Sequence, residues 1–221
     1  MKVRRFSDSL TLSSEVAGLV AGVLAEKNTR PFGVMLSGGQ TPMPAYQRLA
    51  AQRVIVDAHA HVLFSDERVV PSSSPDSNYG RIRPVLAALR VPDDRVLRVQ
   101  ADLGLPRAAE QYDADLKKFL AKGALLRLGL LGLGADGHTA SLFSLTDVQR
   151  GRGLMAIPVV RSVKPDRVSV TATLIEKMDL VVILASGPDK KLIIDRMVRE
   201  PMSLPAGQAV AQARNVELWV C

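Results

Sequence analysis

Only three histidines occur in this sequence, and His138 lies where an imidazole could transfer a proton. It follows Gly132-Leu133-Gly134-Ala135-Asp136-Gly137, a glycine-rich loop after an apolar segment. A neutral imidazole accepts a proton near pH 7, and Asp136, two residues earlier, could orient the ring or fix its tautomer. His59 and His61 instead alternate along one predicted strand, where structural roles are more common. We therefore predict His138 as a general base with Asp136 beside it.

A second cluster, Ser37-Gly38-Gly39-Gln40-Thr41-Pro42, combines glycines with a predicted helix start. Glycines let the backbone turn sharply and approach a ligand closely. Thr41 is a good N-cap and Pro42 suits the first helical position, so backbone amides at the helix start could bind phosphate. The cluster lacks the lysine of a Walker loop and the third glycine of a dinucleotide fingerprint. By itself it fits a phosphate site and a plain capped turn equally well.

A third cluster, Ser65-Asp66-Glu67-Arg68, places two carboxylates and a guanidinium side by side. The planar fork of Arg68 matches phosphate or carboxylate oxygens, and Asp66 could hold Arg68 or a substrate hydroxyl. Taken alone, the cluster is also typical of surface ion pairs. Arg167, on an alternating stretch, and Lys190, at a predicted helix start, are further candidates for phosphate binding. Solvated surface charge is the simpler explanation for each of these two on its own.

The three clusters come after short apolar runs at 33–36, 61–64 and 128–131, and each cluster precedes a segment with helical spacing. Other predicted strands cover 2–6, 155–160, 168–172, 180–184 and 216–220, and other predicted helices cover 9–27, 106–122, 190–198 and 206–212. This alternation predicts a single domain over residues 1–221, a three-layer α/β/α fold with a mostly parallel, Rossmann-like sheet. Because open parallel sheets bind ligands beyond the carboxyl ends of their strands, we expect the clusters to meet in one site.

The 221 residues carry a formal net charge of +7, which could attract an anionic metabolite or nucleic acid. The basic residues are scattered and no strand is rich in aromatic residues, which disfavours nucleic acid. No apolar stretch reaches the roughly 18 to 20 residues of a membrane span, and the N-terminus lacks the apolar core of a secretory signal. The single cysteine, Cys221, leaves no internal disulfide. We expect a soluble, cytoplasmic protein.

In order and spacing, these segments resemble the 6-phosphogluconolactonase family, in the wider group that includes glucosamine-6-phosphate deaminase. The most specific match is Asp136-Gly137-His138-Thr139-Ala140-Ser141-Leu142-Phe143. The other matches are Leu36-Ser37-Gly38-Gly39 with Thr41-Pro42, Asp66-Glu67-Arg68 with Val70-Pro71, Asp76-Ser77-Asn78, Arg167-x-Ser169-x-Thr171 and Gly187-x-x-Lys190. Three features depart from the family: Gln40 replaces a frequent Ser, Ser144 replaces the usual Pro, and the sequence ends at Cys221, before the usual tail. We expect the first two to be tolerated and the third to bear on stability more than on chemistry.

The resemblance implies hydrolysis of 6-phospho-D-glucono-1,5-lactone to 6-phospho-D-gluconate in the oxidative pentose phosphate pathway. His138 would take a proton from water and return it to the leaving ring oxygen. The amides of residues 38–41, with Arg167 and Lys190, would bind the phosphate, while Arg68 could bind phosphate or stabilise the oxyanion. The expected partner is a small sugar-phosphate lactone, with no cofactor, metal, membrane or nucleic acid, and the chain is expected to be a monomer or weak homo-oligomer.

Two alternatives remain open at this point. A glucosamine-6-phosphate deaminase would share the fold and the phosphate site. The corresponding segment of the deaminases, however, resembles Asp-Glu-Tyr, where this chain has Asp66-Glu67-Arg68. They also lack the continuation from Thr139 to Phe143. A non-catalytic phosphosugar sensor would keep the fold without needing a base at His138.

Overall fold

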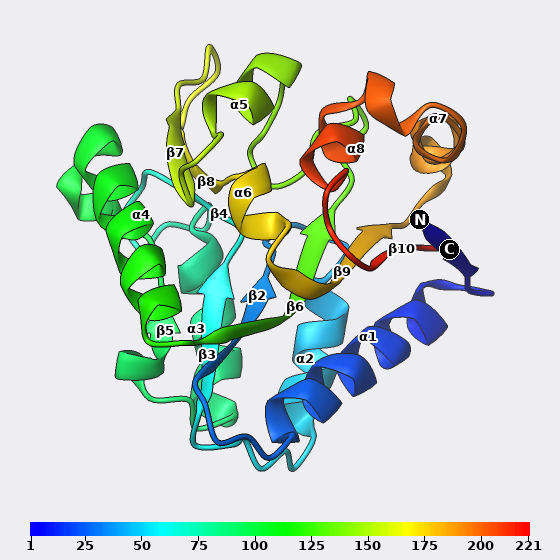
Figure 1. Ribbon diagram of the computed structural model, residues 1–221. Helices are drawn as coiled ribbons and strands as arrows, with labels where there is room; N and C mark the ends of the chain where they lie inside the picture. Colours follow the sequence, from blue (N-terminus) through cyan, green and yellow to red (C-terminus); the bar gives the residue numbers. More distant parts are fainter.

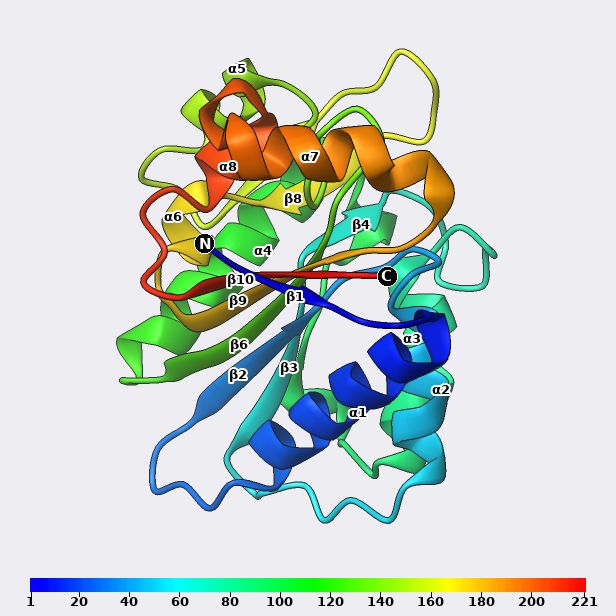
Figure 2. The same cartoon turned by 90° about the vertical axis from the view of Figure 1, so that its right-hand side faces the viewer.

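A parallel sheet of seven strands forms the centre of the computed structural model, which describes all 221 residues (Figure 1). Across the sheet the strands are β1 (Lys2–Arg5), β10 (Val216–Val220), β9 (Met178–Ala185), β6 (Leu125–Gly132), β2 (Phe32–Leu36), β3 (Ala60–Phe64) and β5 (Val96–Leu97). Every neighbouring pair is parallel. The first and last strands of the chain lie side by side, with Val3 opposite Leu218 (Figure 2). The predicted α/β class with a mostly parallel sheet is confirmed.

Helices cover both faces of this sheet (Figures 1 and 2). One face packs against α1 (Ser9–Ala25), α2 (Met43–Ala51) and α3 (Asn78–Ala88). The other packs against α4 (Leu105–Ala121), α5 (Leu145–Arg150), α6 (Ala172–Ile175), α7 (Lys191–Arg199) and α8 (Pro205–Ala209). Short 3₁₀ turns occupy Asp93–Arg95, Ala101–Leu103, Pro188–Lys190 and Pro201–Ser203. None of the helices combines the length and the apolarity that crossing a membrane requires.

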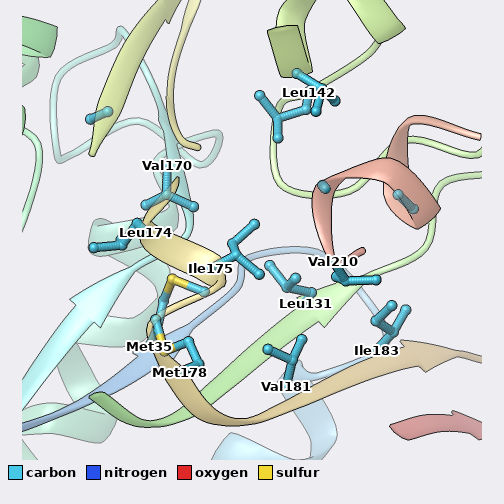
Figure 3. Packing of buried hydrophobic residues seen from close by; sticks show 14 of the residues in the cluster. Met35, Leu131, Leu142, Val170, Leu174, Ile175, Met178, Val181, Ile183 and Val210 are labelled. Carbon is cyan, nitrogen blue, oxygen red and sulfur yellow. The ribbon is translucent and has the colours of Figure 1, made fainter. Parts of the chain in front are cut away.

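The alternation of side chains along the strands builds two separate cores. In β2, Val34 and Leu36 join the core under α1 to α3, whereas Met35 points into the opposite core. Figure 3 shows Met35 there, beside Met178 at the start of β9. Because successive strand residues point to opposite faces, a strand buried on both sides must be apolar throughout, and every residue of β2 is buried.

A small antiparallel sheet, in the order β4-β8-β7, sits above the carboxyl edge of the main sheet. Its strands are β4 (Asp66–Arg68), β8 (Arg167–Val170) and β7 (Ala156–Val159). The expectation that the Ser65 to Arg68 cluster is a loop between a strand and a helix is therefore wrong, because Asp66 to Arg68 form a strand. Three residues are too few to show a period in the sequence, and pairing with the distant β8 is what makes β4 a strand. The predicted strand 168–172 also ends earlier, because Thr171 caps α6.

Two helix starts differ from those predicted. Thr41 does not cap α2: Pro42 occupies the N-cap position, and no side chain bonds the amides there. The helix expected directly after His138 begins only at Leu145, since Thr139 to Leu142 form a tight turn with Ala140 at φ 48°. Ser144 caps α5 in a capping box with Asp147, which gives a structural role to the serine that departs from the family pattern.

The crossover direction reverses between β2 and β6. After β2 the chain builds β3 and β5 on one side, and it then returns to build β6, β9 and β10 on the other. The register of β2 with β6 ends at the pair Met35–Gly129, and the two strands part beyond it. Such a switch point opens a crevice at the carboxyl edge of a parallel sheet.

Candidate active site

A cleft of about 490 Å³ lies at this switch point. Of the residues predicted for the site, it is lined by Ser37, Gly38, Gly39, Gln40, Thr41, Asp66, Arg68, His138, Arg167 and Lys190. Asp136 does not line the cleft and lies behind His138. The structure thus brings together the three sequence clusters, the arginine of β8 and the lysine before α7. His59 and His61 lie outside the cleft, and His61 stacks on Phe119.

Asp136 holds one nitrogen of the His138 ring. Its Oδ1 contacts His138 Nδ1 and also accepts the His138 backbone N–H at 3.2 Å. Burial acts to raise the pKa of Asp136, but the hydrogen bond and charge of His138 outweigh it and hold that pKa below its ordinary value. An ionised carboxylate on Nδ1 favours the tautomer with a proton there, which leaves Nε2 as the free acceptor.

The imidazole ring is held on two further sides. A Cβ on Gly134 would lie 2.1 Å from His138 Nδ1, so only glycine leaves room for the ring. The Phe143 ring packs against it with centroids 4.4 Å apart. The side chain of His138 is 28% exposed, so it remains open to the cleft while its orientation is fixed.

The loop that carries His138 rests on the C-terminal helices. Gly137 adopts φ +85°, and a Cβ there would meet Leu204 and Ile193. The Ala206 N–H, at the start of α8, donates to the Gly137 carbonyl at 2.9 Å. Contacts with α7 and α8, more than fifty residues further along the chain, therefore help to position the loop that carries His138.

Asp66 joins β4 to the loop beyond His138. Its Oδ2 accepts the Ser141 hydroxyl at 2.7 Å, and its Oδ1 accepts the Ser65 hydroxyl at 2.8 Å. The Ser141 N–H in turn donates to Ser169 Oγ of β8 at 3.0 Å. Of the two partners predicted for Asp66, Arg68 is wrong, because the carboxylate bonds these two serines instead, and a substrate hydroxyl stays a prediction.

Glu67, to which the sequence assigns no role, is a buried structural acceptor. It receives the N–H groups of Asn78 and Tyr79, each at 2.7 Å, and the Ser77 hydroxyl at 3.0 Å. Burial raises the pKa of Glu67 in spite of these bonds. The carboxylate ties β4 to the start of α3, where Ser77 is the N-cap.

Two guanidinium groups face the cleft without a carboxylate partner. Arg68 Nη1 donates to the Asp76 carbonyl at 2.7 Å, and Arg167 Nη1 donates to the Pro165 carbonyl. Burial lowers the pKa of Arg167, and the like charge of Arg68 adds to this effect. Lys190 Nζ donates to the Leu133 carbonyl at 3.1 Å, which places a third cation at the cleft. This arrangement favours a ligand with at least one negative charge.

Three buried side-chain atoms in the molecule have no hydrogen-bond partner: Ser37 Oγ, Arg68 Nε and Asn78 Oδ1. All three residues line the cleft. Buried polar groups are nearly always paired in folded proteins, so their concentration here indicates partners that a ligand supplies. No three His, Cys, Asp or Glu side chains come together in a way that could hold a metal ion.

Sequence reasoning gives no binding role to several cleft residues, namely Asn78, Ser141, Phe143, Ser186 and Asp189. In the sequence, Asn78 stands out only as part of the Asp76-Ser77-Asn78 segment of the family resemblance. Its amide lies against Gly38, where a Cβ would come within 1.9 Å of Oδ1. This contact joins residues forty positions apart, and no local pattern could reveal it. Ser186 and Asp189 come soon after β9, so the rule that ligands bind at strand ends could have found them.

The fold and the cleft together are those of an α/β enzyme with a cationic cleft at the switch point of a parallel sheet. Comparison with known proteins narrows the class. Residues 7–219 match the family described as Glucosamine-6-phosphate isomerases/6-phosphogluconolactonase, and the chain belongs to this family.

Two relatives and one solved structure illustrate the similarity. The 6-phosphogluconolactonase of Chlamydia pneumoniae is 31% identical over 89% of this chain and 77% of its own length. That of Homo sapiens is 30% identical over 96% of this chain and 87% of its own length. The crystal structure of 6-phosphogluconolactonase from Thermotoga maritima superposes with a TM-score of 0.83 at 26% identity, covering 99% of this chain and 98% of that one.

Proposed function

We propose that this enzyme hydrolyses 6-phospho-D-glucono-1,5-lactone to 6-phospho-D-gluconate, with His138 as the general base. The observation that carries the proposal is the pairing of His138 Nδ1 with Asp136 in a cleft that also presents Arg68 and Arg167 without carboxylate partners. The named relatives support the choice of substrate. The reaction belongs to the oxidative pentose phosphate pathway, as the family resemblance implies.

In this mechanism His138 Nε2 removes a proton from water as the water oxygen attacks the lactone carbonyl carbon. The bond from that carbon to the ring oxygen then breaks, and the imidazolium returns its proton to the ring oxygen. General base catalysis of this kind contributes about 10²- to 10⁴-fold. Asp136 does not touch substrate and acts as a positioning residue, which keeps the proton of the resting imidazole on Nδ1.

Different groups of the cleft contact the two negatively charged parts of the reacting substrate, which are the phosphate and the developing oxyanion. Arg167, Lys190 and the backbone amides of the loop from Gly38 to Thr41 bind the phosphate, since α2 begins there without a side-chain cap. Arg68 lies directly across from Arg167 in the β4–β8 pair, has its Nε free, and stabilises the oxyanion that develops on the carbonyl oxygen.

A deaminase activity is the main competing function, because the matched family includes both activities. Arg68 favours the lactonase, because it presents a guanidinium to the cleft, whereas the corresponding segment of the deaminases resembles Asp-Glu-Tyr and ends in a tyrosine. A deaminase abstracts a proton from carbon and releases ammonia, so the two reactions have separate products.

The test is to follow acid release from freshly generated lactone, with the spontaneous rate subtracted, and ammonia release from glucosamine 6-phosphate in parallel. We expect lactone hydrolysis well above background and no ammonia. Ammonia release would support the deaminase instead. Tight binding of 6-phosphogluconate with no hydrolysis above background would identify a sensor.

A further inference from the structure

Tyr46 is a buried residue of α2 whose hydroxyl bonds both backbone groups of one residue. It accepts the Ser37 N–H at 3.2 Å and donates to the Ser37 carbonyl at 3.0 Å. The side chain is 0% exposed, and burial raises its pKa, so the phenol stays neutral and can donate and accept at once. Ser37 is the first residue after β2 and a lining residue of the cleft.

The parting of β2 and β6 explains why Ser37 needs such a partner. The Leu36 carbonyl still accepts the Ser65 N–H at 2.9 Å on the β3 side. Successive residues of a strand direct their backbone groups to opposite sides, so Ser37 faces the β6 side, where register has ended at Met35–Gly129. A buried N–H and carbonyl would both be unpaired there without the phenol.

A second tyrosine does the same at the next strand. Tyr112 of α4 accepts the Phe64 N–H at 3.1 Å and donates to the Phe64 carbonyl at 2.7 Å. The two-residue strand β5 pairs only with Val62 and Leu63, so no residue of β5 pairs with Phe64. Of the three tyrosines in the chain, two therefore replace a missing strand at the end of a sheet strand.

The two anchored positions differ in their relation to the cleft. Phe64 does not line the cleft, whereas Ser37 does, and Gly38 and Gly39 come directly after it. Asn78 packs against Gly38 from one side, but Gly39 adopts φ +101° and a Cβ there would meet nothing within 4 Å, so packing does not fix the second glycine. The phenol of Tyr46 is the anchor at the strand end of this loop.

We propose that Tyr46 is a positioning residue for ligand binding: by holding the Ser37 peptide in the gap between β2 and β6, it fixes the loop from Gly38 to Thr41 that receives the anionic end of the ligand. The choice of 6-phosphogluconate as ligand rests on the proposed function, but the anchoring of the loop does not. Without the hydroxyl, the loop samples conformations that do not bind, and affinity falls in proportion.

The experiment compares Tyr46→Phe with Leu49→Ala, which lies one turn further along the same helix and is equally buried. Leu49→Ala loosens the packing of α2 but keeps the phenol. Binding of 6-phosphogluconate and of inorganic phosphate is measured by calorimetry, thermal unfolding reports stability, and amide hydrogen exchange reports Ser37 and the two glycines after it. Steady-state lactone hydrolysis separates KM from kcat.

For Tyr46→Phe we expect both ligands to bind about tenfold more weakly, KM to rise by a similar factor and kcat to stay within about threefold. Exchange at Ser37 and the two glycines should accelerate beyond the change in global stability. For Leu49→Ala we expect a lower melting temperature with ligand affinity retained. Equal loss of affinity in both variants, or unchanged affinity in Tyr46→Phe, would overturn the proposal.

If Tyr46→Phe does not fold, 3,5-difluorotyrosine at position 46 keeps the ring and the hydroxyl, and its fluorines make the phenol more acidic, which strengthens the bond donated to the Ser37 carbonyl and weakens the bond accepted from the Ser37 N–H. A shift of affinity and of Ser37 exchange in this protein supports the anchor, and no shift in either contradicts it. A wild-type chain that binds phosphate but shows no lactone hydrolysis would disprove the proposed function while leaving the phosphate-binding test of Tyr46 intact.

Discussion

The two walls of the cleft hold their functional groups in opposite ways. The β2 wall is the segment from Ser37 to Thr41 with Asn78 against it; there Tyr46 and Asn78 fix the backbone, while Ser37 Oγ and Asn78 Oδ1 have no partner. The β6 wall is the loop after β6 that carries His138; there the functional group itself is paired, because Asp136 contacts one nitrogen of His138 in the absence of substrate. Unpaired polar atoms are typical of a surface that a ligand completes, and a paired imidazole is typical of a group oriented for reaction.

This difference indicates a division of labour. Changes on the β6 wall should act mainly on kcat, and changes among the groups that face the anionic end of the ligand should act mainly on KM. Two glycines of the cleft fit the same division, because Gly134 leaves space for the His138 ring and Gly38 leaves space for the Asn78 side chain.

His138→Ala should have the largest effect, because it removes the group that moves the proton. We expect kcat for lactone hydrolysis to fall by about 10²- to 10⁴-fold, with 6-phosphogluconate affinity changed only a few-fold. Initial rates corrected for spontaneous hydrolysis measure the first, and calorimetry measures the second. His59→Ala is the control, since His59 is 45% exposed and lies outside the cleft. Near wild-type turnover in His138→Ala would remove the base from the mechanism.

Gly134→Ala should come next. Its Cβ would lie 2.1 Å from His138 Nδ1, so the ring must move. A displacement of about 1 Å can cost about 10²-fold in rate, and we expect a loss of that order in kcat with little change in KM. Gly132→Ala, two residues earlier at the end of β6, has nothing within 4 Å of its Cβ and should lose far less. Similar losses in both variants would show that the loop, and not the ring, is what the substitutions disturb.

Arg167→Gln tests the binding side of the comparison. Losing one charge-assisted hydrogen bond of about 1.5 to 3 kcal/mol should raise KM roughly 10- to 100-fold while kcat changes little. Arg127→Gln changes the net charge equally at a surface site paired with Glu26 and Asp179, and it should leave KM within about twofold. A kcat defect in Arg167→Gln with unchanged KM would contradict the assignment of Arg167 to binding of the anionic end of the ligand.

The smallest effect concerns pH and stability. The pKa of Asp136 is lowered in the folded state, so its ionised form stabilises the fold above the ordinary aspartate value of 3.8. This contribution is lost as pH falls through the lower, folded-state pKa. The melting temperature of Asp136→Asn should therefore lie slightly below wild type near neutral pH, and the difference should disappear in acid. Thermal unfolding from pH 7 to 3 measures it, and a difference that grows in acid would contradict the assignment.

The sequence predicts the layers of the fold well, because long apolar runs and helical stripes carry their period locally. The helix predicted over 106–122 is α4, Leu105–Ala121, and the runs ending at Leu36, Phe64 and Leu131 are strands of the parallel sheet. One error falls where pairing is non-local, since β4 exists because it pairs with β8 a hundred residues later. The error at the start of α2 is local, because the turn before the helix leaves Pro42 at the N-cap position in place of Thr41.

The order of residues is enough to predict that a histidine loop, a glycine loop and an arginine cluster each come after a strand, and the rule for parallel sheets predicts that they meet at one edge. The hydrogen-bond partners of these residues follow only from the folded structure. It turned Asp66 toward Ser141 instead of Arg68, buried Glu67 as the anchor of α3, and left Ser37, Arg68 and Asn78 with unpaired atoms. The physical reason is that the order of residues fixes which groups are present, whereas hydrogen-bond partners are shared out among groups that meet only when the chain has folded.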